Sequence, residues 1–230
     1  MAVAFRNEAN MSAIYQCQFV GYRDTLYAKK GLQFYRECNI YGRVDFICGS
    51  ATVVFQNCNL YARLLNETIK FTAQKQKSSS SGYVIQNCSL TVAPGDGPVN
   101  EEEDKAYLGQ PWSNYSKVMV IESLLDTLID PQGWTKMADN EQVDKLIYRE
   151  YRIRGPGLNT SGRVNWPGYK VIHDALEAKP FTVSEFLTGD LWLPNTGMPY
   201  YSGFTTESSA PKVCIMHGFT HMIHCQQKKN

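Results

Sequence analysis

Short apolar runs recur along the first half of the chain, and the same small residue interrupts each of them. Every run reads apolar or aromatic, then polar, then Cys or Ser, then polar, then apolar again. The small residues of successive copies are 21, 20, 30 and 35 residues apart. The copies occupy 14–19, 35–40, 54–60, 84–90 and 118–125.

The spacing of these runs predicts a solenoid of stacked β coils. The runs are too short, and too rich in Val, Ile, Tyr and Phe, for pairs of helices. Leucine-rich repeats have a similar period of about 20 residues, but their Leu-x-x-Leu-x-Leu frame is missing. We therefore expect an all-β parallel β-helix whose coils stack at roughly 4.8 Å, with loops at 75–82 and 92–104. A β-sandwich of short strands is the alternative that the pattern leaves open.

The pattern changes after Trp134. Residues 145–153 alternate as a strand does, and the glycine-proline-glycine segment 155–157 interrupts them. The segment 182–185 (TVSE) has the form of a capping box and predicts a short helix. Residues 205–230 are mostly polar, and we expect them to project from the fold as a tail.

Composition narrows the class of protein. With 43% hydrophobic and 20% charged residues, the chain can bury a sizeable core. The formal net charge of +1 argues against a nucleic-acid binder, and no apolar run reaches the ~18 residues of a membrane span. The first residues lack the pattern of a signal peptide, whereas seven cysteines and five Asn-x-Ser/Thr sequons favour secretion. The sequons are at Asn10, Asn66, Asn87, Asn114 and Asn159.

The repeat brings two aspartates into register. Asp24 and Asp45 each lie seven residues after the cysteine of their copy, Cys17 and Cys38. Equivalent positions of adjacent coils lie side by side, so we expect the two Cα atoms on the order of 5 Å apart. Carboxylates that close favour one protonated and one ionised group, the division of labour used in ester or glycoside cleavage. The alternative is a pair of turn aspartates that point apart into water.

Three segments carry a resemblance: GYRDTLY (21–27) and VDFICG (44–49) around these aspartates, and YLGQPW (107–112) further along the chain. They are similar to GYQDTLY, VDFIFG and YLGRPW of the plant pectin methylesterases, the pectinesterase family. Further matches extend to residue 204. The resemblance implies a right-handed parallel β-helix of the pectin-lyase-like kind. It also implies hydrolysis of galacturonate methyl esters in cell-wall pectin, with release of methanol and without metal or cofactor.

The resemblance implies a role for each matching residue. Asp45 would be the nucleophile, and Asp24 the general acid that later acts as base. Tyr27, Trp112 and Trp134 match positions that line the sugar cleft. A role in the core is the alternative for these aromatic residues, most of all for Trp134.

Four positions depart from the family near the site. Arg23 replaces a glutamine that donates to the oxyanion, and Met1 falls where a second such glutamine stands. Gln110 replaces the arginine that orients the nucleophile, and Cys48 replaces a cleft phenylalanine. Losing one oxyanion donor costs roughly 100- to 1000-fold in rate in other enzymes. The departures therefore predict weak or absent activity. A pectin-binding relative without activity, or a truncated product, is the alternative.

The resemblance extends to organisation and partners. It implies a partial pectinesterase domain at 1–204 that lacks its first coils, followed by a non-homologous tail at 205–230. It implies secretion to the plant cell wall as a glycoprotein, a Cys58–Cys88 disulfide and an unpaired Cys17. We expect pectin as the partner, with a pectinesterase inhibitor protein as a further one, and a monomer that binds neither nucleic acid nor membrane. The tail has histidines and cysteines at spacings found in zinc sites, but we expect no metal there: Cys214, His217, His221, His224 and Cys225.

Overall fold

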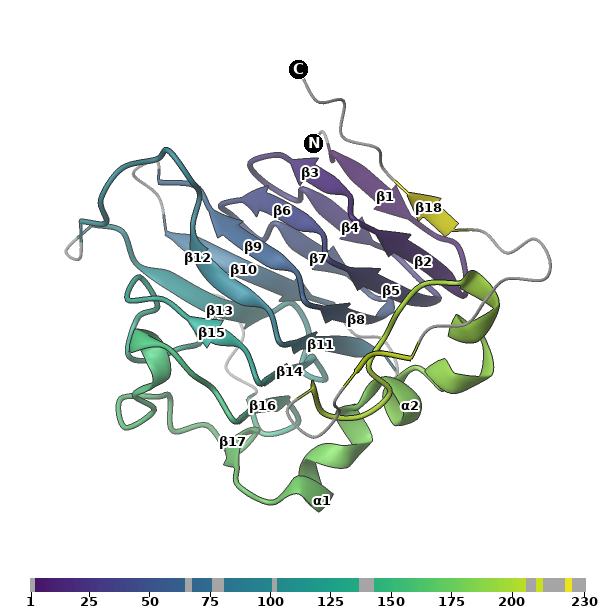
Figure 1. Cartoon of the computed structure of the whole chain (residues 1–230). Helices are drawn as coiled ribbons and strands as arrows, with labels where there is room; N and C mark the ends of the chain where they lie inside the picture. The colour runs from purple at the N-terminus through teal and green to yellow at the C-terminus, as the bar shows by residue number, and fades with distance from the viewer. Residues whose placement is uncertain are drawn as a thin grey trace.

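The chain forms a solenoid of coils whose strands stack into three parallel sheets. The computed structural model describes residues 3–64, 68–75, 81–100, 103–136, 143–205, 210–212 and 222–224. Figure 1 shows the strands lying one above another from the N-terminal coils to the later ones. Every strand pair in the three sheets is parallel, which confirms the predicted β-helix and excludes the sandwich.

The repeated apolar runs form the largest sheet, sheet B. One inward column runs through Ile14, Tyr35, Phe55 and Ile85, all of which are fully buried. The rings of Tyr35 and Phe55 stack with centroids 5.1 Å apart. Sheet B has the order β17 (Tyr169–Ile172), β16 (Ile147–Tyr151), β14 (Lys117–Ile121), β11 (Gly82–Gln86), β8 (Thr52–Gln56), β5 (Leu32–Arg36), β2 (Ser12–Tyr15) and β18 (Met222–His224).

The small residue of each repeat lies just after a left-handed corner. The residue before it has a positive φ in every copy, for example 52° at Glu37 and 56° at Asn57. The small side chain then turns inward and accepts a bond from a neighbouring coil: Cys38 N–H donates to Cys58 Sγ at 3.4 Å, and Cys88 N–H to Ser123 Oγ at 3.1 Å. The same corner and the same bond explain why only Cys or Ser occupies this position.

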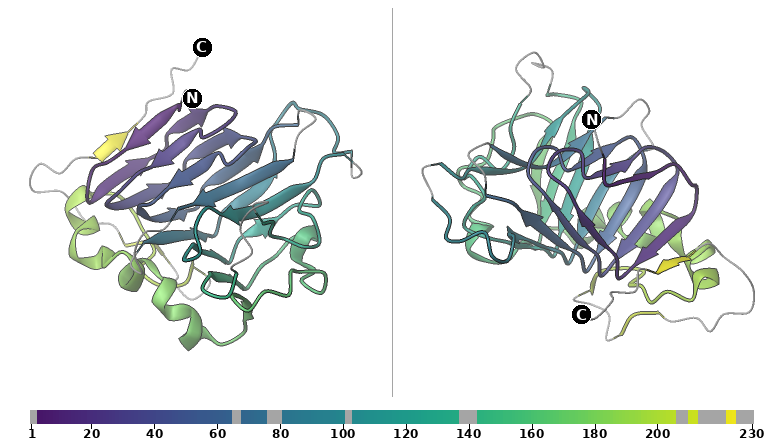
Figure 2. Two further views of the ribbon diagram at one scale, coloured as in Figure 1. Left: turned by 180° about the vertical axis from the view of Figure 1, so that it is seen from behind. Right: turned by 90° about the horizontal axis from the view of Figure 1, so that it is seen from above.

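Two smaller sheets complete each coil. Figure 2 shows the coils end-on in its right-hand view. Buried apolar side chains of the three sheets fill the interior of the coils. Sheet C has the order β15 (Leu124–Leu125), β12 (Ser89–Val92), β9 (Asn59–Ala62), β6 (Asn39–Gly42) and β3 (Gln18–Val20). Sheet A has the order β1 (Phe5–Asn7), β4 (Leu26–Ala28), β7 (Ile47–Gly49), β10 (Ile69–Gln74) and β13 (Ala106–Pro111).

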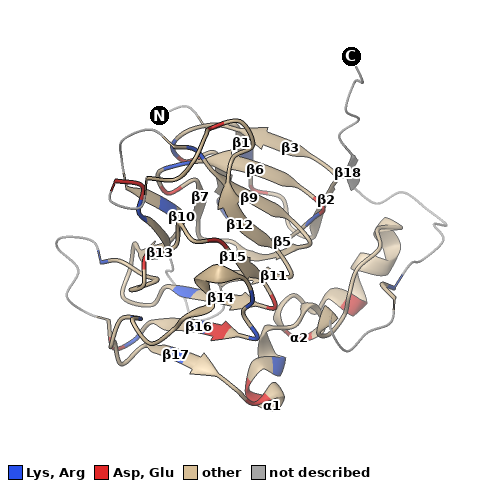
Figure 3. Ribbon diagram, turned by 60° about the vertical axis from the view of Figure 1, so that its left-hand side comes forward, with Lys and Arg blue, Asp and Glu red and all other residues tan. Residues whose placement is uncertain are grey.

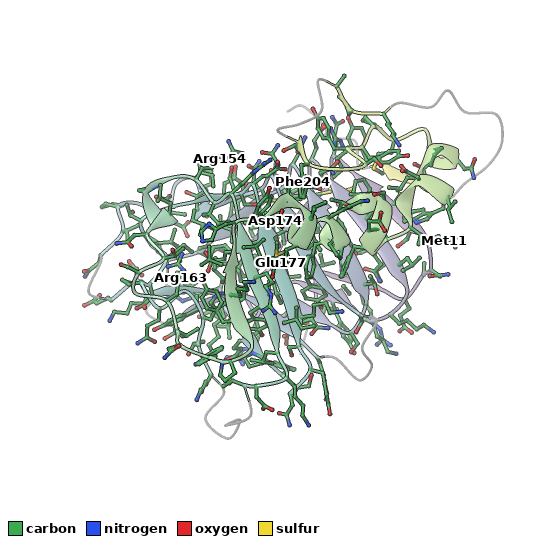
Figure 4. All side chains as sticks on the ribbon, turned by 90° about the horizontal axis from the view of Figure 1, so that it is seen from below. Met11, Arg154, Arg163, Asp174, Glu177 and Phe204 are labelled. Carbon is green, nitrogen blue, oxygen red and sulfur yellow. The ribbon has the colours of Figure 1, made fainter. Side chains whose placement is uncertain are left out.

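Short helical segments cover the outer face of sheet B. Phe204 packs on Tyr151 with ring centroids 5.2 Å apart, and the side chains of Gln56 and Gln86 donate to carbonyl oxygens of the same segment. Figure 4 shows Asp174, Glu177 and Phe204 along this layer. The segments are α1 (Ala175–Ala178), η2 (Lys179–Phe181), α2 (Val183–Phe186), η3 (Gly189–Leu191) and η4 (Leu193–Thr196), whereas η1 (Pro156–Leu158) lies beside β15 of sheet C. The short helix expected from 182–185 is α2, but the hydroxyl of Thr182 donates to the Lys179 carbonyl instead of capping it.

Part of the predicted tail joins the fold. Strand β18 pairs in parallel with β2, so that Ile223 lies opposite Ile14 (Figure 1). The expectation of a tail that projects from the fold is therefore wrong for 222–224, because the edge of β2 offers unpaired main-chain groups.

Cys214, His217, His221 and Cys225 lie outside the described residues. In the described part of the chain, no helix is long and apolar enough to cross a membrane, and no cluster of His, Cys, Asp and Glu has a metal-binding arrangement.

Candidate active site

Asp24 and Asp45 lie on neighbouring coils, at the corner between sheets C and A. Asp24 precedes β4 and Asp45 precedes β7. The Asp24 N–H donates to the Val44 carbonyl at 3.2 Å, and Arg23 and Val44 form a parallel bridge. Both aspartates have left-handed backbones, with φ of 52° and 51°, which aspartate tolerates better than most residues. The register predicted for the pair is confirmed.

Burial of the two carboxyl groups excludes turn aspartates that point into water. Asp24 is 2% exposed and Asp45 is 4% exposed. Burial raises the pKa of Asp45 to about 6, and the nearby Asp24 acts in the same direction. The positive charges of Lys70 and Arg23 and the hydrogen bonds of Gln110 oppose this rise. Asp45 is therefore ionised at neutral pH and close to its protonation range in mild acid.

Gln110 holds the carboxylate of Asp45. Its Nε2 lies 3.0 Å from both carboxylate oxygens. Gln110 belongs to a column of sheet A that also contains Tyr27, Cys48 and Ala73, one from each coil. Because the amide contacts both oxygens, it fixes the plane of the carboxylate but contributes no charge.

Arg23 acts on Asp45 from the exposed side of the corner. Its side chain is exposed, and its charge lowers the pKa of Asp45 less than that of Lys70 does. Solvent screening accounts for a weak effect from an exposed cation. Met1, the second position at which the resembling family has an oxyanion glutamine, lies outside the described residues.

A cavity of about 210 Å³ opens beside Asp24. Within the described part of the chain, Asp24 Oδ2 and Trp112 Nε1 are buried and lack hydrogen-bond partners. A bound polar molecule would supply those partners, because buried polar groups are nearly always paired. The cavity is lined by Val3, Asp24, Tyr27, Cys48, Gly49, Ser50, Lys75 and Trp112.

The cavity combines aromatic rings with one carboxyl group of the pair. Tyr27, Trp112 and Asp24 line it together, whereas Asp45 and Gln110 are not among its lining residues. A larger cavity of about 470 Å³ lies on later coils, between Asp104 and Arg163, and none of the predicted site residues lines it. Chemistry therefore favours the smaller cavity as the site.

Cys48 is buried in this cavity as a protonated thiol. Burial raises the pKa of Cys48 far above its ordinary value, and the nearby Asp24 adds to the rise. The thiol therefore stays protonated and is not a nucleophile.

Trp134 does not line the cleft. It is 0% exposed, and its indole Nε1 donates to Glu150 Oε1 at 3.2 Å. Its ring lies 4.3 Å from that of Tyr148, in the core. The expectation of a sugar-binding Trp134 is therefore wrong, and the alternative, a core aromatic, is confirmed.

The expected Cys58–Cys88 disulfide is also absent. Both thiols are free and buried, and each Sγ faces main-chain atoms: Cys58 N–H donates to Cys88 Sγ at 3.3 Å, and Cys88 Sγ to the Phe55 carbonyl at 3.5 Å. The inward-facing small residues of the repeat thus use these sulfur atoms as hydrogen-bonding groups. Cys17, expected to be unpaired, is disulfide-bonded.

Alkylation of the denatured, non-reduced protein tests this assignment. We expect mass spectrometry to find Cys38, Cys48, Cys58 and Cys88 alkylated, because none of them is oxidised in the structure. Cys17 serves as the internal control, since it should react only after reduction. A disulfide-linked pair of peptides containing Cys58 and Cys88 would contradict the assignment of free thiols at these two positions.

Lys70 is a cation close to Asp45 that the repeat did not reveal. It belongs to β10, and the pairing of Thr72 with Ile47 places it opposite Asp45. The coil that contains it has its cysteine-marked run in 54–60, followed by a longer connection, so counting from the cysteine misses the position. A search for the apolar alternation of β10 could have placed it.

Comparison with known proteins gives a consistent result. A family model described as Pectinesterase matches residues 1–190. The chain is 48% identical to "Probable pectinesterase/pectinesterase inhibitor 39" of Arabidopsis thaliana over 207 residues, which cover 88% of this chain and 39% of that protein. It is 45% identical to "Pectinesterase 2" of Citrus sinensis over 205 residues, with 88% of this chain and 40% of that protein covered. The chain thus spans about 40% of the length of these curated relatives.

Solved structures agree with the fold. The pectin methylesterase from carrot superposes with a TM-score of 0.84 at 38% identity, over 88% of this chain and 65% of the carrot chain. The pectin methylesterase from Aspergillus niger gives a TM-score of 0.69 at 36% identity, over 83% of this chain and 58% of the fungal chain. The likeness to these two enzymes therefore applies to most of the length of this chain.

Proposed function

Because this chain belongs to the pectinesterase family, we propose that it hydrolyses the methyl esters of galacturonate units in pectin and releases methanol. The observation that carries the proposal is the pair of buried carboxyl groups of Asp24 and Asp45, in register beside a cavity with two aromatic rings. Galacturonate is a sugar acid, and the ring faces of Tyr27 and Trp112 suit it.

The reaction follows from the two carboxyl groups. An oxygen of the Asp45 carboxylate attacks the ester carbonyl carbon. The carbon–methoxy bond breaks, Asp24 gives its proton to the departing oxygen, and methanol leaves. The galacturonyl group is then joined to Asp45 as an anhydride. Asp24, now ionised, takes a proton from water, whose oxygen attacks the anhydride and frees Asp45.

The neutral Gln110 favours a slow enzyme, and a second candidate function follows from it. Where the resembling family has an arginine, Gln110 fixes the carboxylate plane through two bonds of 3.0 Å but adds no positive charge. A pectin-binding protein with little or no hydrolysis is therefore the second candidate. It would use the same ring faces and leave the ester intact.

The setting and partners of the proposed enzyme follow the family. We place its action on homogalacturonan in the plant cell wall, as a secreted, glycosylated monomer with a disulfide. Exposed Asn10 and Asn159 are the described sequons best placed for a glycan. The name of the Arabidopsis relative includes an inhibitor, which supports a pectinesterase inhibitor protein as a further partner. Figure 3 shows positive and negative residues interspersed over the coils in one view.

Methanol release from highly methylated pectin tests the proposal, and its pH dependence is expected to follow Asp45. Burial raises the pKa of this nucleophile to about 6, so its reactive, ionised form is present above pH 6 and is lost as the pH falls. We expect kcat/KM to decline by about tenfold per pH unit below that pKa. Tight binding of pectin without methanol at any pH would support the second candidate instead.

A further inference from the structure

We propose that Lys70 is a positioning residue for Asp45, and that it supplies the positive charge that Gln110 lacks. Its ammonium group keeps the nucleophile ionised, while the amide of Gln110 fixes the direction of the carboxylate. The part of this proposal that concerns the reaction rests on the proposed ester hydrolysis. The part that concerns the ionisation of Asp45 does not.

Main-chain bonds place Lys70 beside Asp45. The Lys70 N–H donates to the Arg43 carbonyl at 2.8 Å, and the Phe46 N–H donates to the Lys70 carbonyl at 3.4 Å. The two bonds bracket Asp45 on the preceding coil. The pairing of Thr72 with Ile47 continues the same register. The Cα atoms of Lys70 and Asp45 are therefore neighbours at roughly the 4.8 Å spacing of paired strands.

The side chain of Lys70 leaves the outer face of the coil. The residues that follow Asp45 and Lys70, Phe46 and Phe71, are fully buried and pack with ring centroids 5.2 Å apart. Side chains alternate along a strand, so Lys70, directly before inward Phe71, points to the outer face that holds the cleft. Lys70 is only half-buried, as the stem of a lysine with its ammonium near water should be.

Of the two cations near Asp45, Lys70 lowers the pKa of this carboxyl group more than Arg23 does. Asp24 raises the pKa of Asp45, whereas Lys70 and, more weakly, Arg23 lower it. Cys48 faces the same cavity as a neutral thiol, and the buried Arg43 donates to the Arg63 carbonyl at 2.6 Å. A half-buried cation is screened less than an exposed one, which explains why Lys70 acts more strongly than Arg23.

If Lys70 supplies the positive charge, Gln110 needs only to orient the carboxylate of Asp45. In the resembling family a single arginine would both orient the nucleophile and supply a charge. Here the two tasks are divided between residues on adjacent strands, because Lys70 on β10 and Gln110 on β13 lie on neighbouring coils. The loss of the arginine therefore lowers the positive charge at one position without removing it from the site.

The test compares Lys70→Met, Lys70→Arg and the control Lys145→Met, an exposed lysine that packs on the Tyr115 ring. The carboxyl carbon signal of Asp45 in the folded protein, followed by NMR against pH, reports its pKa. We expect Lys70→Met to raise this pKa and Lys70→Arg to restore it, with no change in Lys145→Met. Arg23→Met should raise it by less than Lys70→Met does.

The pH profile of kcat/KM supplies the second readout. Lys70→Met should move the acidic limb to higher pH and lower kcat/KM at pH 5 by roughly three- to tenfold, while leaving the plateau above pH 8 nearly unchanged. Lys70→Gln replaces Lys70→Met if the methionine variant does not fold. An unchanged Asp45 pKa in these variants would overturn the proposal. A shifted pKa in a protein that releases no methanol would support the role of Lys70 and overturn the proposed function alone.

Discussion

Replacing Asp45 with asparagine is expected to lower kcat for methanol release by roughly 10⁴-fold or more, because an amide oxygen cannot take the place of the attacking carboxylate. The asparagine side chain has nearly the same shape as that of aspartate, and its oxygen would still accept a bond from Gln110. The measurement is single-turnover and steady-state methanol release from highly methylated pectin at pH 8. At that pH the native Asp45, with a pKa of about 6, is fully ionised.

The stability of the Asp45→Asn variant separates chemistry from folding. Burial raises the pKa of Asp45 above its value in the unfolded chain, so the ionised form is disfavoured in the folded state. This cost is absent below the unfolded pKa and grows as the pH rises toward the folded pKa of about 6, above which it is fully present. The variant should therefore melt at the same temperature as the parent, or higher, at pH 8. Asp144→Asn, at an exposed carboxylate, is the matched control and should retain activity. An Asp45→Asn variant that keeps more than a tenth of the activity would contradict the assignment of Asp45 as the nucleophile.

The sequence was most informative where one residue type repeats in one coil position. The Cys or Ser that follows each apolar run is fixed by a left-handed corner and an inward bond to a neighbouring coil, so counting from it gave the register of Asp24 and Asp45 correctly. The same count could not reach Lys70, because its strand follows a connection whose length differs from that of the earlier coils.

Other parts of the site depend on which way a side chain turns, and the sequence is silent on that. Trp112 and Trp134 follow similar polar and glycine-containing segments, yet one borders the cavity and the other is fully buried. A buried carboxylate decides the difference, because Glu150 accepts the indole N–H of Trp134. Likewise, Cys58 and Cys88 are near enough along the stack to suggest a disulfide, but their sulfur atoms bond to main-chain groups.

The buried ion pair behind Trp134 is expected to give the largest effect on stability. Arg163 Nε lies 3.0 Å from Glu150 Oε1, and Nη2 lies 3.2 Å from Oε2, with both side chains at most 2% exposed. Glu150 Oε1 also accepts from the Tyr169 hydroxyl at 2.9 Å. Arg163 further donates to the carbonyl oxygens of Pro131 and Gly157. The pair, with Arg163 marked in Figure 4, thus ties β16 and β17 to the loop at Pro131 and to η1.

Arg163→Met is expected to lower the free energy of unfolding by about 3–5 kcal/mol, because it leaves Glu150 charged and buried without its partner. The measurement is urea denaturation followed by tryptophan fluorescence, which the buried Trp134 should report. The exposed pair of Lys170 and Glu177, joined at 2.7 Å, offers the comparison, and Lys170→Met should change the free energy of unfolding by no more than about 1 kcal/mol.

The double variant Arg163→Met with Glu150→Gln distinguishes an unpaired charge from lost packing. The glutamine amide oxygen can still accept from Trp134 and Tyr169 but carries no charge, so it should recover most of the loss caused by Arg163→Met alone. Recovery would show that the unpaired carboxylate of Glu150 causes the loss in the free energy of unfolding. If the double variant is as unstable as the single one, the bonds from Arg163 to the Pro131 and Gly157 carbonyls account for the loss. In that case the guanidinium stabilises the fold by holding the loop at Pro131 and η1 together, rather than as a counter-ion.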